Sequence, residues 1–284
     1  MIKVVGIFPN KPKDPEFEAV KELADHIIKK GLTPIIEEKF AKECGLEAYA
    51  VDEEAIFSQS DLVVLLGGDG TILGIINRVK KYGTLLLGIN LGHLGFLTDV
   101  DRSGMLESFD KVIAGDYRVE KRMMLDTIID TGEKELVYTS INEVGFYMGG
   151  IIETGVYVND EYIDNFYGDG VLVSSPTGST AYSLAAGGPI LKTDANMMAI
   201  TPICPHMLHA RSIVIGAEDV VKIRINSYTL DCVKTVIDGM PVYDLKLGDE
   251  IIVKKSDYCL NIVKTNNLGF YDVLRNKMFG KEGK

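Results

Sequence analysis

The sequence predicts an α/β N-terminal domain with an open, mostly parallel sheet, followed by a β-rich, sandwich-like C-terminal domain. Over residues 1–100, strand-like apolar runs alternate with helical patterns, and the run Leu62–Leu66 is apolar without interruption. Alternating strands and helices form parallel sheets, in which a strand can be buried on both faces. From about residue 118, short turn-bounded apolar segments follow one another without long helices. That spacing is typical of a β-sandwich.

The elements of the N-terminal domain follow from apolar spacing and from helix start and stop residues. Asp14 and Pro15 predict the start of a helix whose apolar residues recur at helical spacing up to Ile28, and Gly31 ends it. The same reasoning predicts strands at 4–8, 33–36, 62–66 and 84–89 and helices at 52–57, 72–81 and 101–114. Ligands of such sheets bind at the carboxyl ends of the strands.

The second domain should consist mainly of short strands. We expect them at 127–130, 135–139, 143–147, 155–158, 171–174, 212–215, 220–226, 235–237 and 250–254, with a helix at 181–186. A helical stripe over 270–279 predicts a final helix that packs back on the first domain. The expected boundaries are 1–117 for the α/β domain, 118–265 for the β-rich domain and 266–284 for the C-terminal segment.

The composition limits the classes of function. The net charge is −11 and no basic run exceeds two residues, which disfavours a nucleic-acid partner. An anionic ligand must therefore be held locally. The N-terminus lacks an apolar signal core and no stretch reaches the length of a membrane span, so no membrane partner is expected. Scattered cysteines argue against structural zinc and predict reduced, mostly buried thiols in a cytoplasmic protein; they are Cys44, Cys204, Cys232 and Cys259.

A glycine-rich turn, Gly67–Thr71, directly follows the predicted strand 62–66. Its glycines should allow positive φ and let backbone amides approach a ligand closely. A helix starting at Thr71 would present free N–H groups to an anion. Asp69 could act as a base or direct magnesium, so phosphoryl chemistry is the functional hypothesis. The alternative is a tight strand-to-helix turn in which Asp69 only caps the helix.

Two further glycine-rich segments follow predicted strands. Gly88–Phe96 ends the strand 84–89 and should face the same crevice as Asp69. In Gly168–Ile190, an apolar strand breaks into hydroxyls and small residues that can cap the helix 181–186 and admit a planar ligand. Tyr182 could stack on such a ligand. The alternative is a well-capped loop that binds nothing.

Asn142 and Glu143 open a predicted strand. Glu143 could accept both hydroxyl protons of a ribose diol while the Asn142 amide donates to an acceptor beside it. The alternative is a solvated strand edge. His206 and His209 share a helical face, but no carboxylate or cysteine follows at metal-ligand spacing, so no metal site is expected there.

Taken together, these motifs resemble those of the NAD kinases across nearly the full length of the chain. The resemblance rests on Gly67–Thr71, Gly88–Leu97, Asn142-Glu143, Gly168–Pro189 and Thr201–His206. The first motif alone is shared with diacylglycerol kinases, sphingosine kinases and 6-phosphofructokinases, whereas the whole set in this order is specific. The resemblance implies transfer of the γ-phosphoryl of ATP, or alternatively of polyphosphate, to the 2′-hydroxyl of the adenosine ribose of NAD, which makes NADP. Mg²⁺ on the phosphates would assist.

The resemblance also implies roles for single residues. Asp69 would accept the proton of the attacking hydroxyl, Asn142 and Glu143 would bind the ribose, and Asp169 would lie near the nicotinamide side. Domain 1–117 would bind nucleotide, domain 118–265 would bind NAD, and the protein would be a homodimer or homotetramer. The other residues implied to bind the dinucleotide are Gly68 and Gly70 in the turn, Leu73 and Phe96 at the adenine, and Thr177, Thr180, Ala181, Tyr182, Ser183 and Ala185 in the second domain.

Three positions differ from residues that are common in that family. Glu153 and Tyr167 stand where basic residues are common, and Met240 stands where glutamine is frequent. Loss of basic residues should weaken a phosphate contact at residues 153 and 167.

Two other functions stay open at this point. A lipid kinase of the diacylglycerol or sphingosine type would need an apolar or amphipathic membrane-facing patch, whereas this chain is acidic overall. A non-catalytic NAD-binding sensor would use the same pocket without turnover, and the intact Asp69 argues against it.

Overall fold

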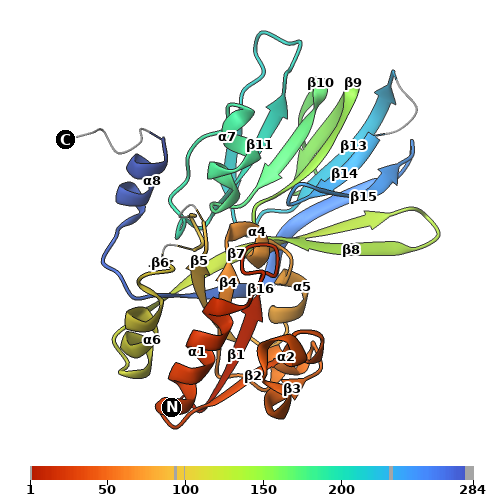
Figure 1. Cartoon of the computed structure of the whole chain (residues 1–284). Helices are drawn as coiled ribbons and strands as arrows, with labels where there is room; N and C mark the ends of the chain where they lie inside the picture. Colours follow the sequence, from red (N-terminus) through yellow and green to blue (C-terminus); the bar gives the residue numbers. More distant parts are fainter. Residues whose placement is uncertain (1, 93–94, 99, 230–232, 279–284) are drawn as a thin grey trace. The chain divides into compact units, whose positions relative to one another are not determined.

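The computed structural model describes residues 2–92, 95–98, 100–229 and 233–278. The chain divides into two compact units (Figure 1), unit 1 with Met1–Lys121 and Leu260–Lys284, and unit 2 with Arg122–Cys259. Unit 1 is α/β, unit 2 is strand-rich, and the C-terminal helix belongs to unit 1, so the predicted fold class is confirmed. His93 and Leu94 of the predicted segment Gly88–Phe96, Cys232, and the end of the C-terminal segment from 279 onward lie outside the described residues.

Unit 1 is built on a parallel sheet with the order β3-β2-β1-β4-β5. The order changes direction between β1 and β4, because β2 and β3 follow on one side and β5 on the other. β5 also pairs in parallel with β6 and with the end of β16. The strands are β1 (Val4–Pro9), β2 (Thr33–Glu37), β3 (Ala50–Val51), β4 (Leu62–Gly67), β5 (Leu85–Asn90), β6 (Val100–Asp101) and β16 (Glu250–Lys264).

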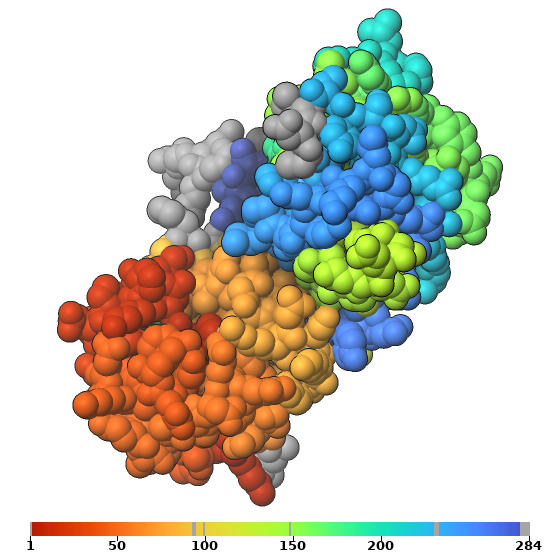
Figure 2. Space-filling view, turned by 90° about the vertical axis from the view of Figure 1, so that its right-hand side faces the viewer, coloured from red at the N-terminus to blue at the C-terminus, as the bar shows by residue number. Residues whose placement is uncertain are grey.

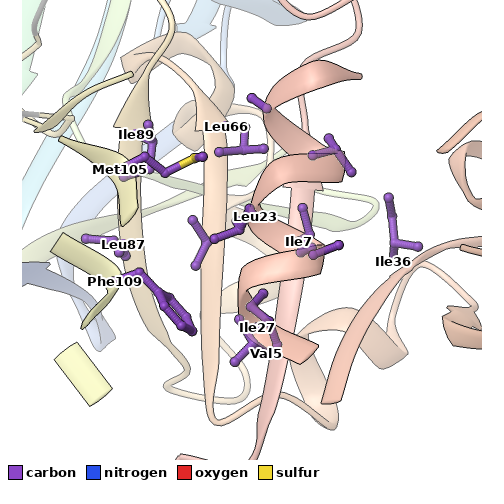
Figure 3. Close-up of a cluster of buried hydrophobic side chains, with 14 of the residues drawn as sticks. Val5, Ile7, Leu23, Ile27, Ile36, Leu66, Leu87, Ile89, Met105 and Phe109 are labelled. Atoms are coloured by element: carbon purple, nitrogen blue, oxygen red, sulfur yellow. The ribbon is translucent and has the colours of Figure 1, made fainter. Parts of the chain in front are cut away.

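Helices cover both faces of this sheet. On one face, Leu23 and Ile27 of α1 lie over β1, and Met105 and Phe109 of α6 lie beside β5 (Figure 3). On the other face, a Cβ at Gly6 would lie 3.1 Å from Ile56 of α3. The helices are α1 (Glu18–Lys29), α2 (Glu38–Cys44), the 3-10 turn η1 (Glu47–Tyr49), α3 (Ala55–Ser58), α4 (Asp69–Leu73), α5 (Ile76–Val79), α6 (Met105–Ile113) and α8 (Phe270–Met278).

Three helices of unit 1 differ from the prediction. Helix α2 was missed because it buries only Ala41 and Cys44 and therefore shows no apolar stripe. The predicted helix 72–81 is divided into α4 and α5, and α4 begins inside the glycine turn at Asp69. The predicted helix 101–114 begins only at Met105, because the Asp101 carboxylate accepts the N–H of Gly104 (2.9 Å) and forms a turn before it.

Unit 2 consists mainly of antiparallel strands, with the order β12-β11-β10-β9-β13-β16. β14 pairs with β9 and β15, and β7 pairs with β8. Asn159-Asp160 and Asp238-Gly239 have positive φ and form the tight turns of two hairpins. The strands are β7 (Arg118–Asp130), β8 (Glu135–Ser140), β9 (Glu143–Val158), β10 (Glu161–Ser174), β11 (Met197–Ile203), β12 (Ile213–Gly216), β13 (Val221–Tyr228), β14 (Val233–Ile237) and β15 (Met240–Leu245), with the short helices η2 (Gly178–Thr180) and α7 (Tyr182–Ala185).

The core of unit 2 lies between these strands and includes Val144, Phe146, Val171 and Ile223. The predicted strands 143–147 and 155–158 are one strand, β9, whose pairing with β10 shifts register between them. Figure 2 shows the tip of the β7–β8 hairpin in yellow-green at the surface of this unit, where residues 132–135 are exposed. Within the part of the chain that the structure describes, no helix has both the length and the apolar composition needed to cross a membrane.

Candidate functional site

The glycine-rich turn lies at the carboxyl end of β4 in unit 1. β4 is buried along its whole length between β1 and β5. The N–H of Asn10, just after β1, donates to the carbonyl of Leu66 (2.9 Å), and the N–H of Leu91, just after β5, donates to the carbonyl of Gly67 (2.9 Å). The ends of these neighbouring strands therefore meet at the turn, as the parallel order requires.

Close contacts, and not positive φ, explain the glycines at positions 67 and 68 of this turn. The expectation of positive φ is wrong, because Gly67, Gly68 and Gly70 are all outside that region and Gly68 is extended at φ −171°. A Cβ on Gly67 would lie 2.2 Å from Thr71 Oγ1, and one on Gly68 would lie 2.7 Å from Lys13 Nζ. Gly70 is exposed and has open space around it. The bare backbone at the first two positions thus admits two polar side chains.

The Asp69 carboxylate is bound by the segment 95–98. Its Oδ2 accepts the N–H of Phe96 (2.8 Å). Its Oδ1 accepts the N–H groups of Leu97 (3.2 Å) and Thr98 (3.0 Å), and also the Thr98 hydroxyl (2.8 Å). A Cβ on Gly95 would lie 1.8 Å from Oδ1, so only glycine fits there. Asp69 therefore does not simply cap its own helix.

A further set of side chains holds these groups in place. The Thr98 hydroxyl accepts from Asn90 Nδ2 (2.8 Å), and Asn90 Oδ1 accepts the N–H of Gly92 (2.8 Å). Thr71 Oγ1 accepts from Asn10 Nδ2 (2.8 Å). Neither asparagine was among the candidates from the sequence. The Asn10–Thr71 contact spans 61 residues, so no local pattern could have revealed it.

Two apolar residues of unit 1, Leu73 and Phe96, were predicted to contact the adenine. Leu73 ends α4, and Phe96 belongs to the segment that binds Asp69; both side chains are half-buried. The Nζ of Lys277 in α8 lies 5.9 Å from the centroid of the Phe96 ring. Phe96 thus has an apolar ring beside one cation and is held by its backbone to Asp69.

Glu143 begins β9 in unit 2 and is almost completely buried, at 5% exposure. Its Oε2 has no hydrogen-bond partner among the described residues. Burial, and next the nearby Asp238 carboxylate, raise the pKa of Glu143 to about 8, although the backbone N–H of Tyr182 acts in the opposite direction. At pH 7 the side chain is therefore mostly protonated, and one of its oxygens is left for a polar ligand.

Asp238 binds the backbone N–H groups of Glu143 and of the two residues before it. Its carboxylate accepts the N–H groups of Ile141 (2.9 Å), Asn142 (2.8 Å) and Glu143 (3.1 Å). Burial raises the pKa of Asp238, and these three hydrogen bonds only partly offset that effect. Asp238 was not among the predicted site residues. The available signal was its Asp-Gly dipeptide between two strand-like runs.

The turn after β10 packs on the backbone of Asn142. The N–H of Ser175 donates to the Asn142 carbonyl (2.9 Å), and a Cβ on Gly178 would lie 2.0 Å from the same oxygen. Thr177 is 3% exposed, and its hydroxyl has no partner among the described residues. The Thr180 hydroxyl donates to the Thr177 carbonyl (3.1 Å). Glu143 and Thr177 thus leave two buried polar atoms unpaired, both on segments that adjoin Asn142.

Aromatic rings stand beside these groups. Tyr182, at the start of α7, is 39% exposed, and its ring meets that of Tyr147 edge to face at 5.5 Å. A Cβ on Gly145 would lie 2.5 Å from the Tyr147 ring, so this glycine makes room for it. Asp169 is half-buried at a register shift of β10, next to the position of β10 that pairs with Tyr147. Sequence reasoning identified Tyr182 and Asp169 but missed Tyr147.

The remaining candidates in α7 have different surroundings. Ser183 is fully buried, and its hydroxyl lies 3.3 Å from that of Thr201, which ties α7 to β11. A Cβ on Gly188 would lie 2.3 Å from the Ser183 hydroxyl. Ala181 is half-buried and Ala185 is exposed. Ser183 therefore contributes to the position of the helix.

Both carboxylate oxygens of Glu153 accept hydrogen bonds from side chains on neighbouring strands. Asn165 Nδ2 donates to its Oε1, and the Ser227 hydroxyl donates to its Oε2 (3.0 Å). The other positions that differ from the family are exposed, Tyr167 at 43% and Met240 at 68%.

The histidines of this unit pack separately. His206 lies edge to face against Tyr167 at 6.1 Å, and His209 Nε2 lies 3.6 Å from the Asp164 carboxylate. Within the described ranges, no three or more histidine, cysteine or acidic side chains are grouped so that they could hold a metal ion.

Comparison with known proteins identifies the family. The family model of the ATP-NAD kinase N-terminal domain matches residues 5–117, and that of the ATP-NAD kinase C-terminal domain matches residues 141–265. The NAD kinase of Caldanaerobacter subterraneus subsp. tengcongensis is 40% identical over 281 residues, which cover 98% of this chain and 99% of the relative. The NAD kinase of a Thermoanaerobacter species is 38% identical with the same coverage.

Solved structures of related kinases also match this chain. Yeast NADH kinase complexed with NADH matches with a TM-score of 0.89 and 28% identity, covering 100% of this chain and 89% of the other. An NAD kinase from Archaeoglobus fulgidus in complex with ATP has a TM-score of 0.71 at 20% identity, covering 93% and 94%, and shares the fold. The predicted resemblance is confirmed: the chain belongs to the ATP-NAD kinase family.

Proposed function

We propose that this protein is an NAD kinase, which transfers the γ-phosphoryl of ATP to the 2′-hydroxyl of the adenosine ribose of NAD and so makes NADP. The observation that carries the proposal is the buried Glu143 with its unpaired Oε2, together with the buried, unpaired hydroxyl of Thr177 on the turn that packs on the Asn142 backbone. Leaving a buried polar group unpaired costs about 1–3 kcal/mol, so such groups in a folded protein point to a missing partner. A ribose diol supplies that partner.

The Asn142 amide would hold an acceptor beside the diol, and Tyr182 would stack on a ring of the dinucleotide. Asp169 would bind near the nicotinamide. Thr177, Thr180, Ala181, Ser183 and Ala185 would shape the remainder of the pocket, with Ser183 acting through the position of α7. Family membership supports this assignment, because the matched model of the ATP-NAD kinase C-terminal domain, residues 141–265, covers all of these residues.

In unit 1, we propose Asp69 as the acceptor of the hydroxyl proton. Each carboxylate oxygen has about two lone-pair sites. Three donors from Leu97 and Thr98 point at Oδ1, whereas Oδ2 accepts one hydrogen bond among the described residues, from the N–H of Phe96. Oδ2 therefore has a lone pair with which it can accept the hydroxyl proton while the four existing hydrogen bonds stay in place. Leu73 and Phe96 would contact the adenine.

Mg²⁺ would enter with ATP. In phosphoryl transfer the ion neutralises charge on the phosphate oxygens, and it usually takes one or two carboxylates besides substrate phosphates. Asp69 is the carboxylate on the glycine-rich turn, and the exposed Gly70, with open space around it, leaves the backbone there accessible to phosphate. Gly68 would act through the room that it gives to Lys13.

The direct test is an assay of the purified protein with NAD, ATP and Mg²⁺, in which a strictly NADP-dependent dehydrogenase detects the product. NADP formation is the expected result. NAD binding without NADP formation under varied donors and metals would establish the alternative of a non-catalytic NAD-binding sensor. Phosphorylation of diacylglycerol or sphingosine in place of NAD would establish the lipid-kinase alternative.

We further propose a cytoplasmic homodimer or homotetramer. β12 stands at the end of the strand order of unit 2, and this unit exposes apolar side chains at Tyr162 (55%), Met197 (45%) and Val214 (43%). An oligomer would cover such edges and side chains. Light scattering that gives a strict monomer of 31.2 kDa would contradict this.

Cys44 and Cys204 are free thiols, as in reducing compartments, although Cys204 is exposed and not buried as predicted.

A further inference from the structure

Lys13 follows β1 and reaches the glycine-rich turn. Its Nζ lies 3.5 Å from the carbonyl of Gly67, and it would be 2.7 Å from a Cβ on Gly68 and 3.7 Å from one on Gly92. The ammonium group thus stands between two stretches of glycine backbone. We propose that Lys13 binds phosphate oxygens of the phosphoryl donor at this turn. The inference rests on the proposed function and assigns a residue to its donor side.

The topology of unit 1 puts Lys13 where a ligand is expected. The sheet order changes direction between β1 and β4, and ligands of open parallel sheets bind outside the carboxyl ends of the strands at such a point. Lys13 follows β1 and the segment Gly67–Thr71 follows β4. The lysine and the glycine-rich turn therefore follow the carboxyl ends of two neighbouring strands.

The loop that carries Lys13 is fixed at both ends. Before it, Asn10 donates its N–H to Leu66 and its side-chain amide to Thr71 Oγ1. After it, Asp14 is buried and its carboxylate accepts the N–H groups of Ala19 (3.1 Å) and Val20 (3.3 Å) in the first turn of α1. A fixed loop costs little entropy when a ligand binds, so the lysine is preorganised for the turn.

Within the described part of the chain, the Lys13 ammonium group forms no ion pair. No carboxylate there lies within ion-pair distance of it, and its contact with the Gly67 carbonyl is long. Lys11, two positions earlier, is paired with Glu43 at 2.7 Å. In a chain of net charge −11, a polyphosphate needs local cations. The Lys13 ammonium is one such cation, and phosphate gives it a charged acceptor in addition to the distant carbonyl of Gly67.

The test compares Lys13→Met with the matched control Lys11→Met, which removes the same charge from the same loop. For Lys13→Met we expect the KM for ATP to rise about 10- to 100-fold, as for loss of a charge-assisted hydrogen bond, while the KM for NAD stays within about twofold. Lys13→Arg should restore most of the ATP affinity, and Lys11→Met should match the parent. A KM for ATP in folded Lys13→Met equal to that of Lys11→Met would overturn the proposal.

A measurement on the unmodified protein gives an independent answer. An amine-acylating reagent is applied with and without ATP, and the modification of Lys11 and Lys13 is read by mass spectrometry. ATP should protect Lys13 and leave Lys11 reactive. Equal labelling of Lys13 with and without ATP would overturn the inference. This readout needs no turnover, so it decides the role of Lys13 even if the protein makes no NADP and the proposed function fails.

Discussion

Replacing Asp69 by asparagine separates two tasks of this carboxylate. It keeps the size of the side chain but removes the negative charge and turns one acceptor oxygen into an NH₂ group. The parent carboxylate accepts four hydrogen bonds from Phe96, Leu97 and Thr98. If the amide oxygen stays opposite Thr98, the NH₂ group faces the N–H of Phe96, and two donors then oppose each other. The substitution should therefore affect both stability and turnover.

The size of each effect follows from these contacts. An unpaired donor costs about 1–3 kcal/mol, and the other bonds weaken because their acceptor is no longer charged, so we expect a loss of about 2–4 kcal/mol in the half-buried site. For a unit of this size the melting temperature should fall by roughly 5–15 °C. Loss of a general base should lower kcat by about 10²–10⁴-fold. NAD affinity should change little, because the ribose contacts proposed for NAD lie in unit 2.

The assay measures kcat, NAD dissociation and melting temperature for Asp69→Asn beside the control Thr98→Val. The control removes one donor to Asp69 and leaves the carboxylate intact, so it should cost about 1–2 kcal/mol and keep kcat within about tenfold of the parent. Near-parent turnover in folded Asp69→Asn would refute the role as base. An equal loss of turnover in Thr98→Val would show that Asp69 acts by holding the segment 95–98.

Three further predictions concern single positions. Glu143→Gln should raise the KM for NAD by about tenfold with little change in kcat, since the contact that we propose would hold the diol in both ground and transition states; steady-state kinetics test this, and a loss confined to kcat would contradict it. The pKa of Glu143 is about 8 in the folded protein against 4.5 for an ordinary glutamate, so the folded state holds an extra proton between these values. The stability that this extra proton adds is fully present below about pH 4.5 and is lost as the pH rises to about 8. The free energy of unfolding of Glu143→Gln, measured by denaturation at several pH values, should not show that decline. A decline equal to that of the parent protein would refute the assignment. Gly67→Ala should destabilise the protein by about 1–3 kcal/mol because its Cβ meets Thr71, whereas Gly68→Ala should fold normally and raise the KM for ATP by displacing Lys13; equal melting temperatures for the two variants would contradict this.

The sequence predicted most accurately those features that depend on local pattern. The uninterrupted apolar run of β4 and the glycine turn after it are adjacent in the chain, so the local pattern was enough to predict Asp69 at the end of a strand. The Asn142-Glu143 pair and the hydroxyl-rich turn that begins near Ser175 were recognised for the same reason. Here the side chain and the element that positions it lie within a few residues of one another.

Contacts between distant segments could not be predicted. Asp69 is bound by residues 27 to 29 positions later, and Asp238 binds residues 95 to 97 positions earlier. The division of the helix after Asp69 and the continuity of β9 also depend on what packs against them. Positive φ in the glycine turn was a wrong expectation, because a glycine can be required by a neighbouring side chain as well as by its own backbone, and only the folded chain distinguishes the two reasons.

The hydrogen-bonded carboxylate of Glu153 has a consequence for how this position can vary in evolution. Glu153 on β9, Asn165 on β10 and Ser227 on β13 share one network, and Asn226 extends it by donating to Asn165 (2.9 Å). A basic side chain at 153 would leave the Asn165 amide and the Ser227 hydroxyl without their acceptor. The effects of substitutions at these positions should therefore be strongly non-additive. We expect relatives with lysine or arginine at this place to differ at the partner positions too, so that the three residues are exchanged as a group.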